Sequence, residues 1–233
     1  MSQHPKRKPI AARDLLKQRA QDPEYKAQMR ELEKQRIAAA EEYNEAAAPL
    51  MAELLSSGYD VKSLDELAQS SAYKDAVSIL IRWLPKMVNP RVKQSIVRAL
   101  SVPWARPSAV TALVTEFCNA PDSTNSGLKW AIGNALKVLA SDDNFDDIVK
   151  LVQDKRHGTA RQMLAIALGK IKNPKAVDVL MCLLDDDDVV GQALTSLKKL
   201  KAKQARTHIE RLINHPNAWV RKQAKQALIK IDS

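Results

Sequence analysis

Four histidines and two cysteines are the side chains in this 233-residue chain that are most often used for metal or nucleophilic chemistry. None of the histidines, His4, His157, His208 and His215, has metal-ligand spacing with a Cys, Asp or Glu. The sequence has no glycine-rich phosphate loop and no nucleophile elbow. We therefore expect a protein that is not an enzyme and that needs no metal and no cofactor.

The two cysteines and a run of four aspartates have structural interpretations. Cys118 and Cys182 stand inside apolar helical patterns, which predicts reduced core residues rather than a disulfide framework. The run "DDDD" (185–188) falls in a turn, where Asp187 and Asp188 are expected to cap the next helix. A divalent-metal site there lacks any partner motif.

The elements that must position any functional side chain are internal repeats. Five related stretches end at Leu100, Leu136, Leu168, Leu197 and Leu228, and they read "VKQSIVRAL", "LKWAIGNAL", "ARQMLAIAL", "VVGQALTSL" and "VRKQAKQAL". An amphipathic segment precedes each of them, at 73–84, 108–118, 144–154, 173–184 and 202–213. Asn-Pro or His-Pro in three of the connecting turns favours a helix start. The sequence thus predicts five stacked helix pairs in an all-α fold.

The second helix of each unit, with the pattern "V-R/K-x-x-x-x-x-A-L", resembles that of the HEAT-repeat superfamily, in particular the short bacterial HEAT-like (PBS-lyase-type) repeats. The resemblance covers roughly residues 73 to 231. It implies a right-handed α-solenoid of about five HEAT-like helix pairs, and it says little about function, because this superfamily includes scaffolds, adaptors, lyases and a few DNA-repair enzymes. A DNA glycosylase of this class would use paired tryptophans, whereas the four here are dispersed. Glycosylase or lyase activity stays open as an alternative.

The N-terminal third is expected to differ from the repeats. Residues 1–12 read as a disordered basic tail, residues 13–72 as a helical extension or cap, and residues 73–233 as the repeat domain. A long helix is predicted from Pro23, with a kink or break at Pro49, a glycine cap at Gly58 and a capping box in "SLDE" (63–66). The extension either caps the first repeat or docks a partner.

The net charge of +10 is concentrated at the ends of the chain. Residues 73–106 carry seven Lys and Arg against one Asp, and residues 201–233 carry eight against two acids, whereas residues 107–200 carry eleven against twelve. A protein that follows a nucleic acid along its length is expected to be basic in the middle too. No apolar run has the length of a signal peptide or a membrane span, so we expect a soluble, cytoplasmic protein.

The concave face of the predicted solenoid is the expected binding surface. In each second helix, the residues six and two positions before the final leucine should project there. The first set is Gln94, Trp130, Gln162, Gly191 and Lys222, and the second is Arg98, Asn134, Ile166, Thr195 and Gln226. Amides and one indole favour a protein or peptide groove, with Trp130 as anchor. The predicted partner-binding residues are Gln94, Arg98, Trp130, Asn134, Gln162, Lys222 and Gln226.

A cation seven positions before the final leucine recurs in four of the five copies, as Lys93, Lys129, Arg161 and Arg221. Either these cations pair with groups of adjacent turns, or they form a binding ladder. The alternative function is nucleic-acid binding by the basic tail together with the first and last repeats. Under that hypothesis the binding residues are Arg91, Lys93, Arg221 and Lys225.

Overall fold

A computed structural model describes residues 19–70, 73–121 and 127–232 of the chain. All regular structure in those residues is helical. The chain divides into two compact units, with the division after Ala46. The expected basic tail, residues 1–12, lies outside the described residues. No helix in the described ranges is long and apolar enough to cross a membrane.

The predicted long helix is α2 (Pro23–Ser56), which passes through the division between the two units. The sequence predicts a kink or a break at Pro49. The break is wrong, because the helix continues past that residue, and the kink stays a prediction. Pro49 has no N–H to donate to the preceding turn. On either side of it, however, Ala47, Leu50 and Leu54 are buried in the second unit, and their burial holds the backbone helical.

The predicted glycine cap is present after this helix, and the predicted capping box is half formed. Gly58 has a φ of 91°, and the Tyr59 N–H donates to the Leu54 carbonyl at 2.9 Å, which is the Schellman arrangement. The Ser63 hydroxyl accepts from the Glu66 N–H at 3.1 Å and so begins α3 (Leu64–Gln69). The Glu66 carboxylate accepts from the Lys62 N–H at 2.7 Å, one residue before the partner that a capping box uses.

The five predicted helix pairs are confirmed. They are α4 (Ala76–Trp83) with α5 (Pro90–Leu100), α6 (Ser108–Asn119) with α7 (Leu128–Leu139), α8 (Phe145–Gln153) with α9 (Gln162–Leu168), α10 (Lys175–Cys182) with α11 (Val190–Leu200), and α12 (Arg206–Glu210) with α13 (Ala218–Asp232). We call the earlier member of each pair the first helix and the later member the second helix.

Short 3-10 segments complete many of the connections. They are η1 (Leu84–Lys86), η2 (Pro103–Ala105), η3 (Asp142–Asn144), η4 (Lys155–Arg161), η5 (Leu183–Asp185), η6 (Lys203–Ala205) and η7 (Arg211–Asn214). The predicted Asn-Pro start of α5 uses the Asn89 side chain, which accepts from the N–H groups of Arg91 and Val92. Segment η4 contains Gly158 with a φ of 49°, so α9 begins later than its sequence copy suggests.

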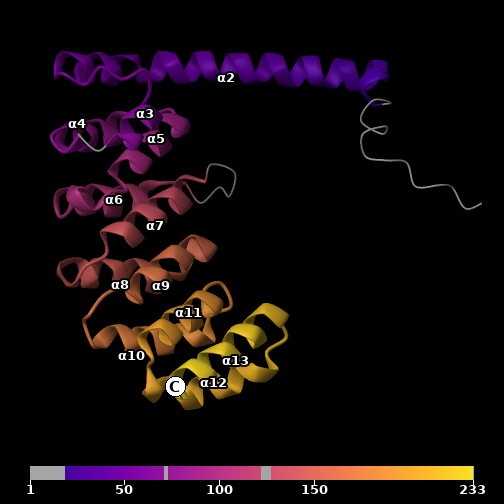
Figure 1. The fold of residues 1–233 in the computed structure, drawn as a ribbon, viewed down its shortest axis with the longest axis vertical. Helices are drawn as coiled ribbons and strands as arrows, with labels where there is room; N and C mark the ends of the chain where they lie inside the picture. Colours follow the sequence, from indigo (N-terminus) through magenta and orange to yellow (C-terminus); the bar gives the residue numbers. More distant parts are fainter. Residues whose placement is uncertain (1–18, 71–72, 122–126, 233) are drawn as a thin grey trace, which may run out of the picture. The chain divides into compact units, whose positions relative to one another are not determined.

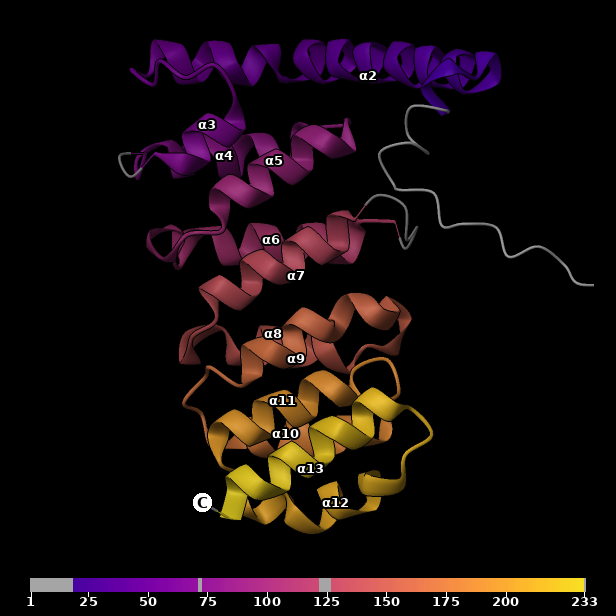
Figure 2. The ribbon, with the colours of Figure 1, turned by 45° about the vertical axis from the view of Figure 1, so that its right-hand side comes forward.

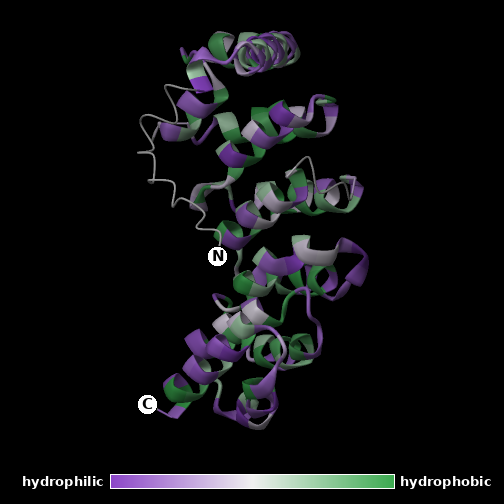
Figure 3. Ribbon diagram, turned by 90° about the vertical axis from the view of Figure 1, so that its right-hand side faces the viewer, coloured by the Kyte–Doolittle hydropathy of each residue, from purple (hydrophilic) through white to green (hydrophobic). Residues whose placement is uncertain are grey.

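The pairs stack in chain order to form an α-solenoid (Figure 1). Each second helix packs against the next, from α5 through α7, α9 and α11 to α13, and α3 packs against α5 at the start of this row (Figure 2). Hydrophobic and hydrophilic residues alternate along the helices of the stack (Figure 3). The buried side chains, which include Leu100, Leu136, Leu168 and Leu197, form a core that is shared between neighbouring pairs.

The cysteine prediction is partly wrong. Both Cys118 and Cys182 carry free thiols, but both are exposed rather than in the core. In α10 the buried residues are Ala176 and Leu180, and a residue two positions after Leu180 points away from the core. The apolar pattern places a cysteine on a helix without deciding which face it takes.

Candidate partner-binding surface

The predicted surface residues lie on consecutive second helices that pack side by side. We define the second-helix face as the ten positions six and two residues before the final leucines. Trp130, Arg98, Lys222 and Gln226 are exposed, five others are half-buried, and Gly191 is buried. The anchor candidate Trp130 keeps 58% of its surface exposed, the largest fraction among the four tryptophans, all of which lie in described residues.

Polar contacts already hold several of these side chains. The Asn134 amide donates to the Trp130 carbonyl at 3.1 Å, and its oxygen accepts from Lys137 Nζ at 2.9 Å. Gln162 Nε2 donates to the Asp188 carbonyl at 2.9 Å. Arg98 lies 3.9 Å from the Asp65 carboxylate of α3, in an exposed ion pair that contributes little.

One contact recurs between neighbouring repeats. The residue six positions before the final leucine of one repeat lies against the residue nine positions before the final leucine of the next repeat. Gln162 reaches Asp188 in this way, and Gln94 lies beside Gly127. The same relation places the Trp219 ring on Gly191, where a Cβ atom would lie 1.6 Å from Trp219 Cζ3. Glycine is therefore required at 191 for the indole to pack against α11 in this way.

Trp219 is a surface residue that the sequence reasoning missed. It remains 46% exposed although its ring covers Gly191. Trp130 on the second-helix face and Trp219, which lies against Gly191 of that face, are thus both partly exposed indoles. The sequence does contain a signal for this contact. At the position six residues before the final leucine, the fourth copy has Gly191, whereas every other copy has a larger residue.

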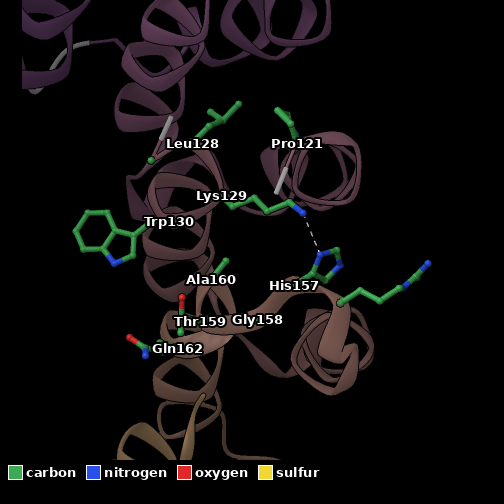
Figure 4. A pocket seen from close by; sticks show the side chains of 11 residues that line it. Pro121, Leu128, Lys129, Trp130, His157, Gly158, Thr159, Ala160 and Gln162 are labelled. Atoms are coloured by element: carbon green, nitrogen blue, oxygen red, sulfur yellow. Dashed lines mark hydrogen bonds between the residues drawn. The ribbon is translucent and has the colours of Figure 1, made fainter. Parts of the chain in front are cut away.

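A pocket of about 460 Å³ opens beside Trp130. It lies where α7 meets η4, and its lining includes Lys129, His157, Thr159 and Gln162. Trp130 and Gln162 point to one side of the pocket region, and Lys129 and His157 lie on the other side, joined by a contact of 3.2 Å between Nζ and Nδ1 (Figure 4). The pocket therefore adjoins the second-helix face but is also part of the packing between the second and third pairs.

The recurring cations are directed into the stack. Lys93 pairs with Glu116 of the next pair, and Lys129 contacts His157, whose ring packs edge-on against Phe117. Arg221 donates to the His215 and Pro216 carbonyls at 2.7 and 2.8 Å. Of the residues expected to bind nucleic acid, Lys93 and Arg221 thus have partners within the protein, whereas Arg91 and Lys225 are exposed.

Arg161 is the most deeply buried of these cations, with 0% of its surface exposed. Its guanidinium donates to the Val152 carbonyl at 3.0 Å and to the Asp186 carboxylate at 2.8 Å, and it also reaches Asp188. The hydrogen bond and charge of Arg161 lower the pKa of Asp186. The third pair is thereby tied to the turn of the fourth.

The four aspartates of that turn connect neighbouring repeats, and the predicted capping role is wrong. No side chain caps α11. Asp186 and Asp188 face Arg161, while Asp187 lies 3.2 Å from His215 and Asp185 lies 3.6 Å from Arg211. In the described part of the chain, no group of three or more His, Cys, Asp or Glu side chains is arranged to hold a metal ion.

Charge is segregated between the two rows of helices. The five second helices contain eleven Lys and Arg and one acid, Asp232, whereas the five first helices contain four Lys and Arg and five acids. The neutral sum for residues 107–200 conceals this separation, because the acids of the middle repeats lie in the turns and the first helices.

Comparison with known proteins agrees with this architecture. A family model described as HEAT repeats matches residues 114–198, which run from α6 into α11. A designed armadillo repeat protein, solved in complex with the peptide (KR)4, has a TM-score of 0.51 at 19% identity, over 81% of this chain and 97% of that one. A second designed armadillo repeat protein has a TM-score of 0.44 at 18% identity, over 72% and 91%. No curated protein matches the chain. The fold class is that of HEAT and armadillo solenoids.

Proposed function

We propose that this protein is a non-catalytic repeat scaffold that binds a protein or peptide partner through the second-helix face. The observation that carries the proposal is Trp130, an indole that is 58% exposed in the middle of a row of packed helices. Exposed aromatic residues supply much of the binding energy of protein interfaces. Aromatic residues are enriched in interfaces relative to the rest of a protein surface.

Amide groups beside Trp130 favour a polypeptide partner. Asn134 uses one donor and one lone pair within the protein, and Gln162 uses one donor. Each side-chain amide has two donors and an acceptor with two lone pairs, so both retain capacity for a peptide backbone. The armadillo design that shares the fold was solved with a peptide bound, which supports a peptide as occupant of such a solenoid.

The proposal is tested by panning a peptide library against the wild-type protein and measuring the affinity of the selected peptides for variants. We expect Trp130→Ala to cost about 2 kcal/mol, or roughly 30-fold in Kd. Val88→Ala is the matched control, because Val88 is 94% exposed in the turn before α5, away from the predicted surface positions. Equal affinity of wild type and Trp130→Ala for every selected peptide would contradict the proposal.

Nucleic-acid binding is the second candidate, and the excess of cations on the second helices favours it. Arg91, Lys222 and Lys225 are exposed there. Binding to duplex and single-stranded DNA that is tight and falls steeply with salt would support this candidate. Weak binding that is little changed by removing residues 1–20 would count against it.

A further inference from the structure

Four cations from successive repeats gather at the C-terminal ends of the second helices. We call these residues, Arg106, Lys137, Lys170 and Lys199, the basic edge. Arg106 precedes α6, Lys137 and Lys199 lie in the last turns of α7 and α11, and Lys170 follows α9. Lys137, Lys170 and Lys199 come from residues 107–200, where the summed charge is close to zero, and Arg106 ends the basic stretch before them.

Two of these side chains converge on the end of α7 from opposite neighbours. Arg106 Nη2 donates to the Val138 carbonyl at 2.8 Å, and Lys170 Nζ donates to the Lys137 carbonyl at 3.1 Å. These bonds satisfy carbonyls that a helix end leaves open. Each uses one donor of a group that has five in Arg or three in Lys, so most donors of the basic edge remain available to a ligand.

The charges of the other three cations of the basic edge act on Lys170. None of the four forms an ion pair with a carboxylate of the described residues. Burial and then the charges of Lys137, Lys199 and Arg106 lower the pKa of Lys170. A single cation at a helix C-terminus is stabilised by the helix dipole, but Lys170 is also repelled by three other cations, and a bound anion would offset that repulsion.

The basic edge adjoins the second-helix face. Lys137 Nζ donates to Asn134 at 2.9 Å, and Asn134 in turn donates to the carbonyl of Trp130. Two acids, Asp143 and Asp147, line a space of about 200 Å³ together with Arg106. These acids belong to η3 and α8, and no acid is among the groups that shift the pKa of Lys170.

We propose that the partner segment is an acidic peptide, whose Asp or Glu side chains bind Lys137, Lys170 and Lys199 while an apolar neighbour packs on Trp130. The inference rests on the proposed function and names the chemistry of its partner. Charge complementarity selects the sign, which is opposite to that of the (KR)4 peptide in the armadillo design. The adjacent indole and amides favour a polypeptide over a phosphate backbone.

The test is fluorescence anisotropy with labelled (DE)4, (KR)4 and oligothymidine on the full chain. We expect (DE)4 to bind at least about tenfold more tightly than either of the others, and to lose about tenfold in the triple variant Lys137→Gln, Lys170→Gln, Lys199→Gln. The control triple Lys150→Gln, Lys175→Gln, Lys203→Gln makes the same change in net charge at exposed positions outside the second helices and should keep the affinity.

Several results would overturn the inference. One is an equal loss of affinity for (DE)4 in the basic-edge triple variant and in the control triple variant. Another is tighter binding of (KR)4 than of (DE)4. A third is tighter binding of oligothymidine than of (DE)4, if that preference disappears in the basic-edge triple variant. Thermal unfolding of both triple variants shows whether each remains folded. If peptides selected by panning depend on Trp130 but not on the basic edge, the proposed function stands and the acidic partner fails. If they depend on the basic edge alone, the anchor role of Trp130 fails.

Discussion

Arg161 joins the third repeat to the fourth through a buried charge. Because its guanidinium is fully buried, its removal leaves Asp186 without its cation and the Val152 carbonyl without its donor. Breaking a buried ion pair on one side typically costs about 3–5 kcal/mol. We expect Arg161→Met to lose about that much free energy of unfolding in urea titrations, whereas the exposed-pair control Arg206→Gln should lose no more than about 1 kcal/mol. Equal losses would contradict the assignment.

The same pair predicts how stability depends on pH. Arg161 lowers the pKa of Asp186 in the folded protein below its value in the unfolded chain. The stabilisation is therefore fully present above the unfolded pKa of about 3.9 and is lost as pH falls through the folded pKa. Urea unfolding between neutral pH and the acid limit should show a smaller loss of stability for Asp186→Asn than for wild type. Parallel curves would exclude the pair as a source of acid sensitivity.

At the scale of elements, the sequence predicts the helices better than their contacts. Apolar periodicity and Asn-Pro turns are local signals, and they place the five pairs close to their observed bounds. Continuity of α2 through Pro49 depends on burial of Leu50 and Leu54. The role of the aspartates in η5 and the following turn depends on Arg161 and Arg211, cations of two other repeats. Such contacts join residues 25 or more positions apart, and no local pattern encodes them.

The contact between Gly191 of α11 and Trp219 of α13 predicts a coupling between two helices. An added methyl group at 191 would overlap the indole and displace it, at a cost of about 1–3 kcal/mol. In Trp219→Ala the space is empty, so Gly191→Ala should cost much less in that background. A double-mutant cycle by urea unfolding, with indole fluorescence to follow exposure of Trp219, measures the difference. Additive losses would show that the indole does not lie on Gly191.

At the scale of the whole molecule, distribution of charge matters more than its sum. The five second helices carry eleven Lys and Arg and one acid, whereas the five first helices carry nearly equal numbers of basic and acidic residues. Summing the charges of consecutive residues predicts a neutral middle of the chain. Such a sum adds the residues of the first helices, the turns and the second helices together, although these lie on different sides of the molecule. The basic edge is found only when the ends of successive helices are brought together, as Lys170 and Arg106 are at α7.

The extension before the repeats has different surroundings in its two parts. Leu50, Leu54, Leu64 and Leu67 are buried in the second unit, and Glu53 accepts from Trp83 Nε1 at 2.6 Å. In the first unit, Met29, Leu32 and Ile37 of α2 are about half exposed. The sequence left open whether residues 13–72 cap the first repeat or dock a partner. We propose that residues 47–70 act as the cap and that residues 19–46 act as the docking arm.

The most direct test of the central claim uses the four indole N–H signals in an NMR spectrum. A peptide selected by panning is added to the full chain. Partner binding on the second-helix face predicts that the Trp130 signal shifts, while Trp83, bonded to Glu53, and Trp104, packed on Tyr73, stay in place. A peptide that binds but shifts Trp83 or Trp104 and leaves Trp130 unchanged would contradict the account.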